Sequence, residues 1–189
     1  MRVLLDTNVL IHLLDKRAPK DIQDRLKGLL EDVENARGRV IIPALVVAEY
    51  LIKAEAAGKA LLDALLRSRF VEIAPFDHVA AVECAAMQEA ASATGNKRAP
   101  LGRDIAWQKV KVDRQIVAIA KVRADRIVAD DKEIHELAAA ASITVQRVSD
   151  LPLPVWAQQL GIEGVQHVAQ PPKRRMRLRA VTAEPAEGR

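Results

Sequence analysis

The chain contains 189 residues, half of them hydrophobic, which suffices to bury the core of one globular domain and leave a tail. No apolar run approaches the roughly 18–20 residues that cross a bilayer, so the sequence predicts a soluble protein with no membrane contact. Cys84 is the only cysteine, which excludes an internal disulfide bond and a four-cysteine zinc site. Since the first residues also lack a signal-peptide pattern, the composition predicts a cytoplasmic location.

The net charge of +4 is concentrated in the last part of the sequence. Residues 171–189 contain six Lys or Arg and two Glu, whereas the preceding 170 residues contain 23 basic and 23 acidic side chains. The folded part is therefore expected to be neutral, and the composition of the tail predicts disorder. The basic residues of the tail are Lys173, Arg174, Arg175, Arg177, Arg179 and Arg189.

Short apolar segments alternate with amphipathic ones along residues 1–150, which is typical of an α/β domain with a mostly parallel central sheet. Strands are expected at 1–5, 39–42, 70–74, 126–129 and 143–148. Helices are expected to begin near residues 7, 19, 43, 59, 77, 113 and 132, with Gly58 ending the third. An extended loop is expected at residues 94–111. Residues 151–170 are expected to form a C-terminal extension, in which residues 155–160 pack back on the domain.

Several acids lie where a carboxylate would face the core or a cleft beside it. Asp6 follows the first strand, and Asp130 and Asp131 follow the fourth. Glu49 and Asp113 lie on apolar helix faces, which are expected to consist of Leu45, Val46, Ile52 and Ala56 in one helix and Ile116, Val117 and Ala120 in the other. Ligand sites of parallel sheets lie at the carboxyl ends of the strands, so these acids are expected to converge there. Converging carboxylates need a hard cation, which predicts a site for Mg²⁺ or Mn²⁺.

Four short motifs in chain order carry a resemblance to a known family. They are Leu5-Asp6-Thr7-Asn8-Val9-Leu10, Val46-Val47-Ala48-Glu49-Tyr50-Leu51, Val112-Asp113-Arg114-Gln115-Ile116-Val117-Ala118-Ile119-Ala120 and Ile127-Val128-Ala129-Asp130-Asp131-Lys132. In this order they resemble the motifs of the PIN-domain ribonucleases. The resemblance covers residues 1–150 and implies a PIN-like nuclease domain in three layers, with a mostly parallel sheet between helices.

The resemblance also implies an activity, which is metal-dependent hydrolysis of RNA. The residues that would bind one or two Mg²⁺ or Mn²⁺ ions are Asp6, Glu49, Asp113 and Asp131. Thr7 or Asn8 would orient Asp6. Many bacterial members of the family are toxins held by a cognate antitoxin, and many are dimers, so both partners are expectations here.

The fourth motif departs from the family pattern. Ala129 stands where a Thr is common, and Ile134 stands where an aromatic residue is usual. Aligned on the turn, Asp131 takes the ligand position, while Asp130 stays open as the alternative ligand. The missing hydroxyl at position 129 removes one hydrogen bond from the site and predicts weakened catalysis.

Each acid also has a structural explanation. Asp6 and the Asp130–Asp131 pair could cap helices. Asp113 could be an acid near a helix N-terminus that the helix macrodipole stabilises. Glu49 could form an ion pair. The order of all four along the chain favours the functional interpretation.

The segment 94–111 contains basic and aromatic side chains that could bind RNA phosphates and stack a base. The alternative is a solvated surface loop anchored by its tryptophan. A solvated tail is likewise the alternative for the basic run near residue 175. The candidate RNA-binding residues are Lys97, Arg98, Arg103, Trp107, Lys109, Lys111, Arg174 and Arg175.

Two other functions remain open from the sequence. A phosphotransferase of the haloacid-dehalogenase type also has an Asp after its first strand, but it wants a second acid two residues later, where this chain has Asn8. A catalytically weak RNA-binding module with a PIN-like fold is the non-enzymatic alternative, because of Ala129.

Deletion of residues 171–189 is expected to weaken RNA affinity, because this segment carries the whole charge excess. Each lost phosphate contact should flatten the slope of log K against log salt by about 0.7 for single-stranded RNA. Binding measured across a salt series tests this. An unchanged slope would show that the tail does not hold RNA, and the segment 94–111 would become the better candidate.

Overall fold

The computed structural model describes residues 1–158. The predictions for residues 159–170, for the tail and for Arg174 and Arg175 lie outside the described residues. Five strands form one sheet: β1 (Arg2–Leu5), β2 (Arg39–Pro43), β3 (Val71–Ala74), β4 (Arg126–Val128) and β5 (Thr144–Gln146). All five strand predictions are confirmed, with boundaries shifted by one or two residues.

Every strand pair is parallel, and the strand order is β3-β2-β1-β4-β5. The chain winds outward from β1 through β2 to β3, then crosses back and pairs β4 with the other edge of β1. Since crossovers between parallel strands are right-handed, this reversal puts the two sets of connecting helices on opposite faces of the sheet. The winding direction therefore changes between β1 and β4, where ligands of such sheets bind.

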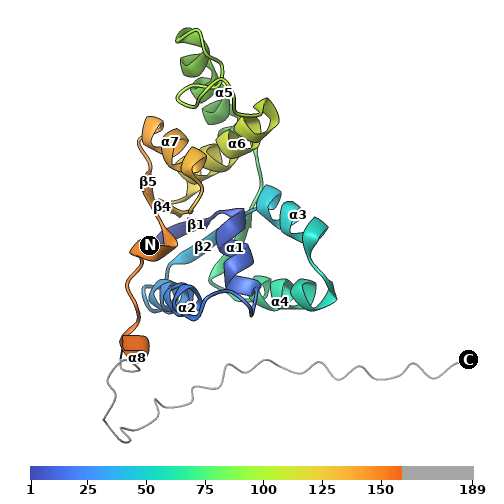
Figure 1. Cartoon of the computed structure of the whole chain (residues 1–189), viewed down its shortest axis with the longest axis vertical. Coiled ribbons are helices and arrows are strands. Elements are labelled where there is room, and N and C mark those ends of the chain that lie inside the picture. Colours follow the sequence, from blue (N-terminus) through green and yellow to red (C-terminus); the bar gives the residue numbers. More distant parts are fainter. Residues whose placement is uncertain (159–189) are drawn as a thin grey trace, which may run out of the picture.

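The helices are α1 (Thr7–Leu14), α2 (Lys20–Asn35), α3 (Ala44–Lys53), α4 (Ala56–Leu66), α5 (His78–Ala93), α6 (Trp107–Arg123), α7 (Lys132–Ala140) and α8 (Val155–Gln158), with a 3₁₀ turn at Val148–Asp150. Figure 1 shows α6 and α7 on one side of the sheet and α2 and α4 on the other. Helix α6 packs against α5, α7 and β2. The three-layer α/β architecture expected from the sequence is thus confirmed.

Three helix boundaries differ from the prediction, one of them being the start of α4 at Ala56 instead of residue 59. Helix α6 begins at Trp107, six residues before Asp113, because no glycine or proline follows Gly102 to delay it. Helix α3 ends at Lys53, where Ala54 adopts an extended conformation, so Gly58 lies inside α4 instead of ending a helix.

The apolar helix face that was expected around Glu49 is therefore present only in part. Val46 is buried, but Ile52 is 83 % exposed, and Ala56 belongs to the next helix. The buried residues of α3 are instead Val46 and Tyr50, which both belong to the core.

The three central strands, β2, β1 and β4, are buried on both faces, whereas the edge strands β3 and β5 are partly exposed. Residues Val3–Leu5, Val40–Ile42 and Ile127–Val128 are each at most 1 % exposed. The segment after the sheet returns to the domain, since the Trp156 indole donates to Glu31 of α2 at 3.1 Å. This contact links α8 to the domain, but α8 buries none of its own residues, so the expected packing of residues 155–160 stays a prediction. Within residues 1–158, no helix is both long and apolar enough to cross a membrane.

Gly38→Ala is expected to destabilise the domain by roughly 1–3 kcal/mol. A Cβ atom at Gly38 would lie 2.1 Å from the Met1 carbonyl oxygen, which accepts the Arg39 amide where β1 meets β2. Urea denaturation measures the loss. Gly95→Ala is the control, since its Cβ would meet no atom within 4 Å and only its φ of +76° would be strained. Equal effects of the two substitutions would contradict the steric explanation.

Candidate active site

The carboxyl ends of β1 and β4 lie side by side. Leu5 pairs with Val128 in register, and the Asp6 amide donates to the Val128 carbonyl at 3.2 Å. Both strands end at the point where the winding of the sheet reverses. The acids that follow the two strands, Asp6 and Asp131, are thereby brought to one place by the backbone alone.

Asp6 is a buried carboxylate at the start of α1, where its side chain makes no capping hydrogen bond. Burial raises its pKa to about 6, against the opposing effect of the Thr7 amide. The charges of Asp131, Asp113 and Glu49 raise this pKa further. Among the described residues, no Lys, Arg or His pairs with Asp6.

Asp113 lies in the second turn of α6 and faces inward, as predicted. Ile116, Val117 and Ala120 on the same face are at most 2 % exposed. Burial raises the pKa of Asp113 to about 6 even though the Lys109 ammonium opposes the shift. Because Asp113 is not in the first turn, the macrodipole explanation for it does not hold.

Asp131 and Asp130 point in different directions. Asp131 caps α7 by accepting the Glu133 amide at 2.8 Å, and its other oxygen accepts from Lys109 at 2.8 Å. Burial alone would raise the pKa of Asp131, but these hydrogen bonds lower it below its ordinary value. Asp130 is exposed and accepts the Val148 amide at 3.0 Å. The geometry therefore favours Asp131 over the alternative ligand Asp130.

Glu49 lies at the rim of the group, with 44 % of its side chain exposed. One of its oxygens accepts from the Thr7 hydroxyl at 2.9 Å, and the other pairs with Lys53 at 2.9 Å. The Lys53 hydrogen bond is the largest cause that holds the pKa of Glu49 below its ordinary value. Thr7 therefore orients Glu49 and not Asp6 as expected, while Asn8 is exposed.

Lys109 and Glu133 also lie among the acids of the candidate site, although the sequence analysis placed neither residue there. The Lys109 ammonium lies 3.1 Å from Asp113, 2.8 Å from Asp131 and 3.3 Å from Glu133. These contacts raise the pKa of Lys109 above its ordinary value, although burial opposes this. Lys109 was expected to bind RNA, and its place one turn before Asp113 becomes visible only when α6 is known to begin at Trp107.

The four predicted acids thus converge on one end of the sheet, with Glu49 at the rim. Within residues 1–158, no three Asp, Glu, His or Cys side chains already have the spacing of a metal-binding cluster. The ammonium of Lys109 lies among three of the acids instead.

A protein-family model matches most of this chain. The PIN domain family model matches residues 3–140 of the 189-residue chain. The chain belongs to the PIN domain family. No curated protein sequence matches it significantly.

Solved structures share the PIN fold at low identity. VapBC2 from Rickettsia felis, bound to a promoter DNA fragment, is 16 % identical, with a TM-score of 0.54 over 78 % of this chain and 98 % of that one. VapBC from Salmonella typhimurium, also bound to DNA, is 19 % identical, with a TM-score of 0.50 and coverage of 78 % and 98 %. VapBC-1 from nontypeable Haemophilus influenzae is 16 % identical, with a TM-score of 0.50 and coverage of 79 % and 99 %.

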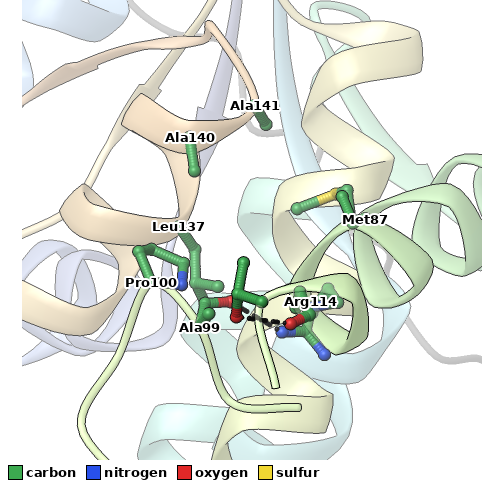
Figure 2. Close-up of a pocket in the computed structure, with 10 residues that line it drawn as sticks. Met87, Ala99, Pro100, Arg114, Leu137, Ala140 and Ala141 are labelled. Atoms are coloured by element: carbon green, nitrogen blue, oxygen red, sulfur yellow. Dashed lines mark hydrogen bonds between the residues drawn. The ribbon is translucent and has the colours of Figure 1, made fainter. Parts of the chain in front are cut away.

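A cavity of about 250 Å³ in this PIN domain lies away from the acids, between α5, α6 and α7. Figure 2 shows Ala140, the last residue of α7, and the following Ala141 opposite Met87 of α5, with Arg114 at one edge. The Arg114 guanidinium is buried and donates to the carbonyls of Lys97 and Ala99 at 3.3 and 3.2 Å. Its role is structural, since it ties the segment after α5 to α6.

Two basic residues within segment 94–111, Arg98 and Arg103, also hold the segment together. Arg98 donates to the Ile105 carbonyl at 2.8 Å, and Arg103 to the Gly95 carbonyl at 3.2 Å. Trp107 is partly buried, with the Lys97 ammonium 4.9 Å and the Lys111 ammonium 5.9 Å from its ring centre. The tryptophan thus anchors the segment, as the structural alternative predicted. Three of the candidate RNA-binding residues still line one cavity of about 380 Å³, namely Lys97, Arg98 and Arg103.

Asp6→Asn is expected to stabilise the metal-free PIN domain at pH above about 6, by up to about 3 kcal/mol. The folded protein binds the Asp6 proton up to about pH 6, whereas the unfolded chain releases it near 3.8. The ionised carboxylate therefore destabilises the fold progressively as the pH rises from about 4 to about 6. Urea denaturation of both proteins in EDTA, across this range, measures the difference.

Asp125→Asn provides a control of opposite sign. The backbone amide of Arg2, which donates to Asp125 at 2.8 Å, is the main cause that lowers the pKa of this acid. Removing its charge should therefore lower stability at neutral pH. An Asp6→Asn protein that unfolds more easily than wild type at every pH would show that Asp6 is a structural cap.

Proposed function

We propose that this PIN domain is an endoribonuclease that uses Mg²⁺ or Mn²⁺ to hydrolyse RNA phosphodiester bonds. The observation that carries the proposal is the convergence of Asp6, Asp113 and Asp131, with Glu49 at the rim, where the sheet reverses its winding. Two of these acids have a pKa near 6, which marks the group as strained by burial and mutual repulsion. Such perturbed acids are typical of functional sites.

The chemistry of the side chains fits a hard divalent cation. All the donors are carboxylate oxygens, which Mg²⁺ and Mn²⁺ prefer. Asp6 is 5 % exposed and has no cationic partner in the described part of the chain, so a bound cation would relieve its burial. The residues that would hold the ion are Asp6, Glu49, Asp113 and Asp131. A divalent ion there would supply positive charge to a phosphodiester and its leaving oxygen.

The chain's own contacts would position these ligands. Thr7 fixes the orientation of Glu49 through its hydroxyl, and the Glu133 amide fixes Asp131. The Ala129 carbonyl lies 2.7 Å from the Nε2 atom of His135, so this nitrogen carries the proton and donates. That bond closes the end of β4 on the α7 side, next to the acids.

RNA as the substrate is proposed from the likeness to PIN-domain ribonucleases. The cavity lined by Lys97, Arg98 and Arg103 offers a basic surface for phosphates, and the tail would add charge. The structural neighbours are VapBC complexes, which supports a toxin-type role with a cognate antitoxin. A homodimer remains a prediction.

Of the alternatives, the catalytically weak RNA-binding module is favoured by two observations. Ala129 lacks a hydroxyl, and the Lys109 ammonium lies among the acids. The phosphotransferase alternative is disfavoured, because Asn8 occupies the position of the second acid and is exposed.

Asp113→Asn and Asp131→Asn are each expected to reduce cleavage of a generic single-stranded RNA by more than about a hundredfold. Asp130→Asn is the matched control and should cleave like the wild type, because its carboxylate contacts only the Val148 amide among the described residues. Cleavage should stop in EDTA and return with Mn²⁺. Activity that survives in Asp113→Asn, prepared in the same way, would reveal a contaminating nuclease or a different site.

A further inference from the structure

Lys109 occupies an unusual position for a lysine of a helix surface. Its ammonium lies within 3.3 Å of Asp113, Asp131 and Glu133, and only 39 % of its side chain is exposed. Each of its three N–H donors can therefore face a different carboxylate. Another lysine, Lys53, pairs with Glu49 at the rim of the acids, whereas Lys109 lies at their centre.

The Lys109 ammonium balances charges that would otherwise destabilise the fold. Asp113, Asp131 and Glu133 place three carboxylates around this one ammonium, at 3.1, 2.8 and 3.3 Å. Removing one partner of a partly buried ion pair leaves the other charge uncompensated. The position of Lys109 therefore offsets the repulsion among Asp113, Asp131 and Glu133 in the metal-free domain.

We propose that Lys109 is a resident cation that neutralises the acid group in the metal-free protein and competes with the divalent ion for Asp113 and Asp131. The inference rests on the proposed metal site and adds a means by which the chain regulates its occupancy. Its basis is the geometry of the three contacts.

A divalent ion and the ammonium compete for the same carboxylates, because two positive charges held by Asp113 and Asp131 would repel each other at short range. Mg²⁺ demands carboxylate oxygens at about 2.0–2.1 Å, whereas Lys109 holds its partners at 2.8–3.3 Å with its own charge between them. Binding of the ion is therefore expected to displace the Lys109 side chain from Asp113 and Asp131. Its flexible stem and partial exposure provide a path to solvent. The expected consequence is a fold that is stable without metal and a metal affinity below that of the unopposed acids.

Lys109→Met tests the competition, with Mn²⁺ as the probe. Isothermal titration of EDTA-stripped protein is expected to show Mn²⁺ binding at least about tenfold tighter than in the wild type. The metal-free variant should melt at a lower temperature than the wild type, and Mn²⁺ should raise its melting temperature by more.

Lys132→Met is the matched control. It removes the same charge from the residue next to Asp131, but Lys132 is 80 % exposed and pairs with Glu136 at 3.3 Å. It should leave both measurements close to wild type. Lys109→Arg keeps the charge and should keep Mn²⁺ affinity weak. If Lys109→Met is unfolded without metal, added Mn²⁺ should restore its circular dichroism spectrum, and a spectrum that stays unfolded would overturn the proposal.

The outcomes separate this inference from the proposed metal site. Wild-type binding of Mn²⁺ that Asp113→Asn abolishes and Lys109→Met leaves unchanged would overturn the role of Lys109 and keep the site. Equal tightening by Lys109→Met and Lys132→Met would reduce the effect to net charge and also overturn it. Absence of Mn²⁺ binding in both the wild type and Lys109→Met would overturn the metal site together with this inference.

Discussion

The parallel pairing of β1 with β4 determines where the candidate site forms. These strands are far apart in the sequence, yet their registered ends place Asp6 beside the turn that carries Asp131. The sheet reverses its winding at this pair, which is the place where ligands of parallel α/β sheets bind. Helices α3 and α6 each turn an acid toward it, and the whole group depends on that one strand contact.

The same convergence opposes folding. Burial and mutual repulsion raise the pKa of Asp6 and Asp113 to about 6, so both are ionised at neutral pH at the expense of stability. Cationic contacts offset this at Asp113, Asp131 and Glu49, whereas at Asp6 only the amide of Thr7 opposes it. A chain selected only for stability would not keep such an arrangement, and conflicts of this kind are expected at functional sites.

Helix α6 links the core, the acids and the segment before it. One of its faces carries Asp113 above fully buried aliphatic side chains. Its first turns carry Trp107 and Lys109, and Arg114 on another side binds carbonyls of the segment after α5. The basic residues of that segment therefore serve its architecture first, and only the donors left over are available to a polyanion.

Local patterns in the sequence determined the α/β class, the parallel sheet and the placement of Asp6, Asp113 and Asp131. Side chains repeat their direction every two residues in a strand and every 3.6 residues in a helix. Strand ends and helix faces can therefore be recognised without knowledge of distant contacts. The attachment of Thr7 to Glu49 and the turn of Asp130 toward Val148 were decided by the tertiary structure. Each depends on which segment, remote in sequence, comes to lie beside the residue. The role of Lys109 is of the same kind, because an ammonium becomes the centre of an acid group only when α6 and α7 pack together.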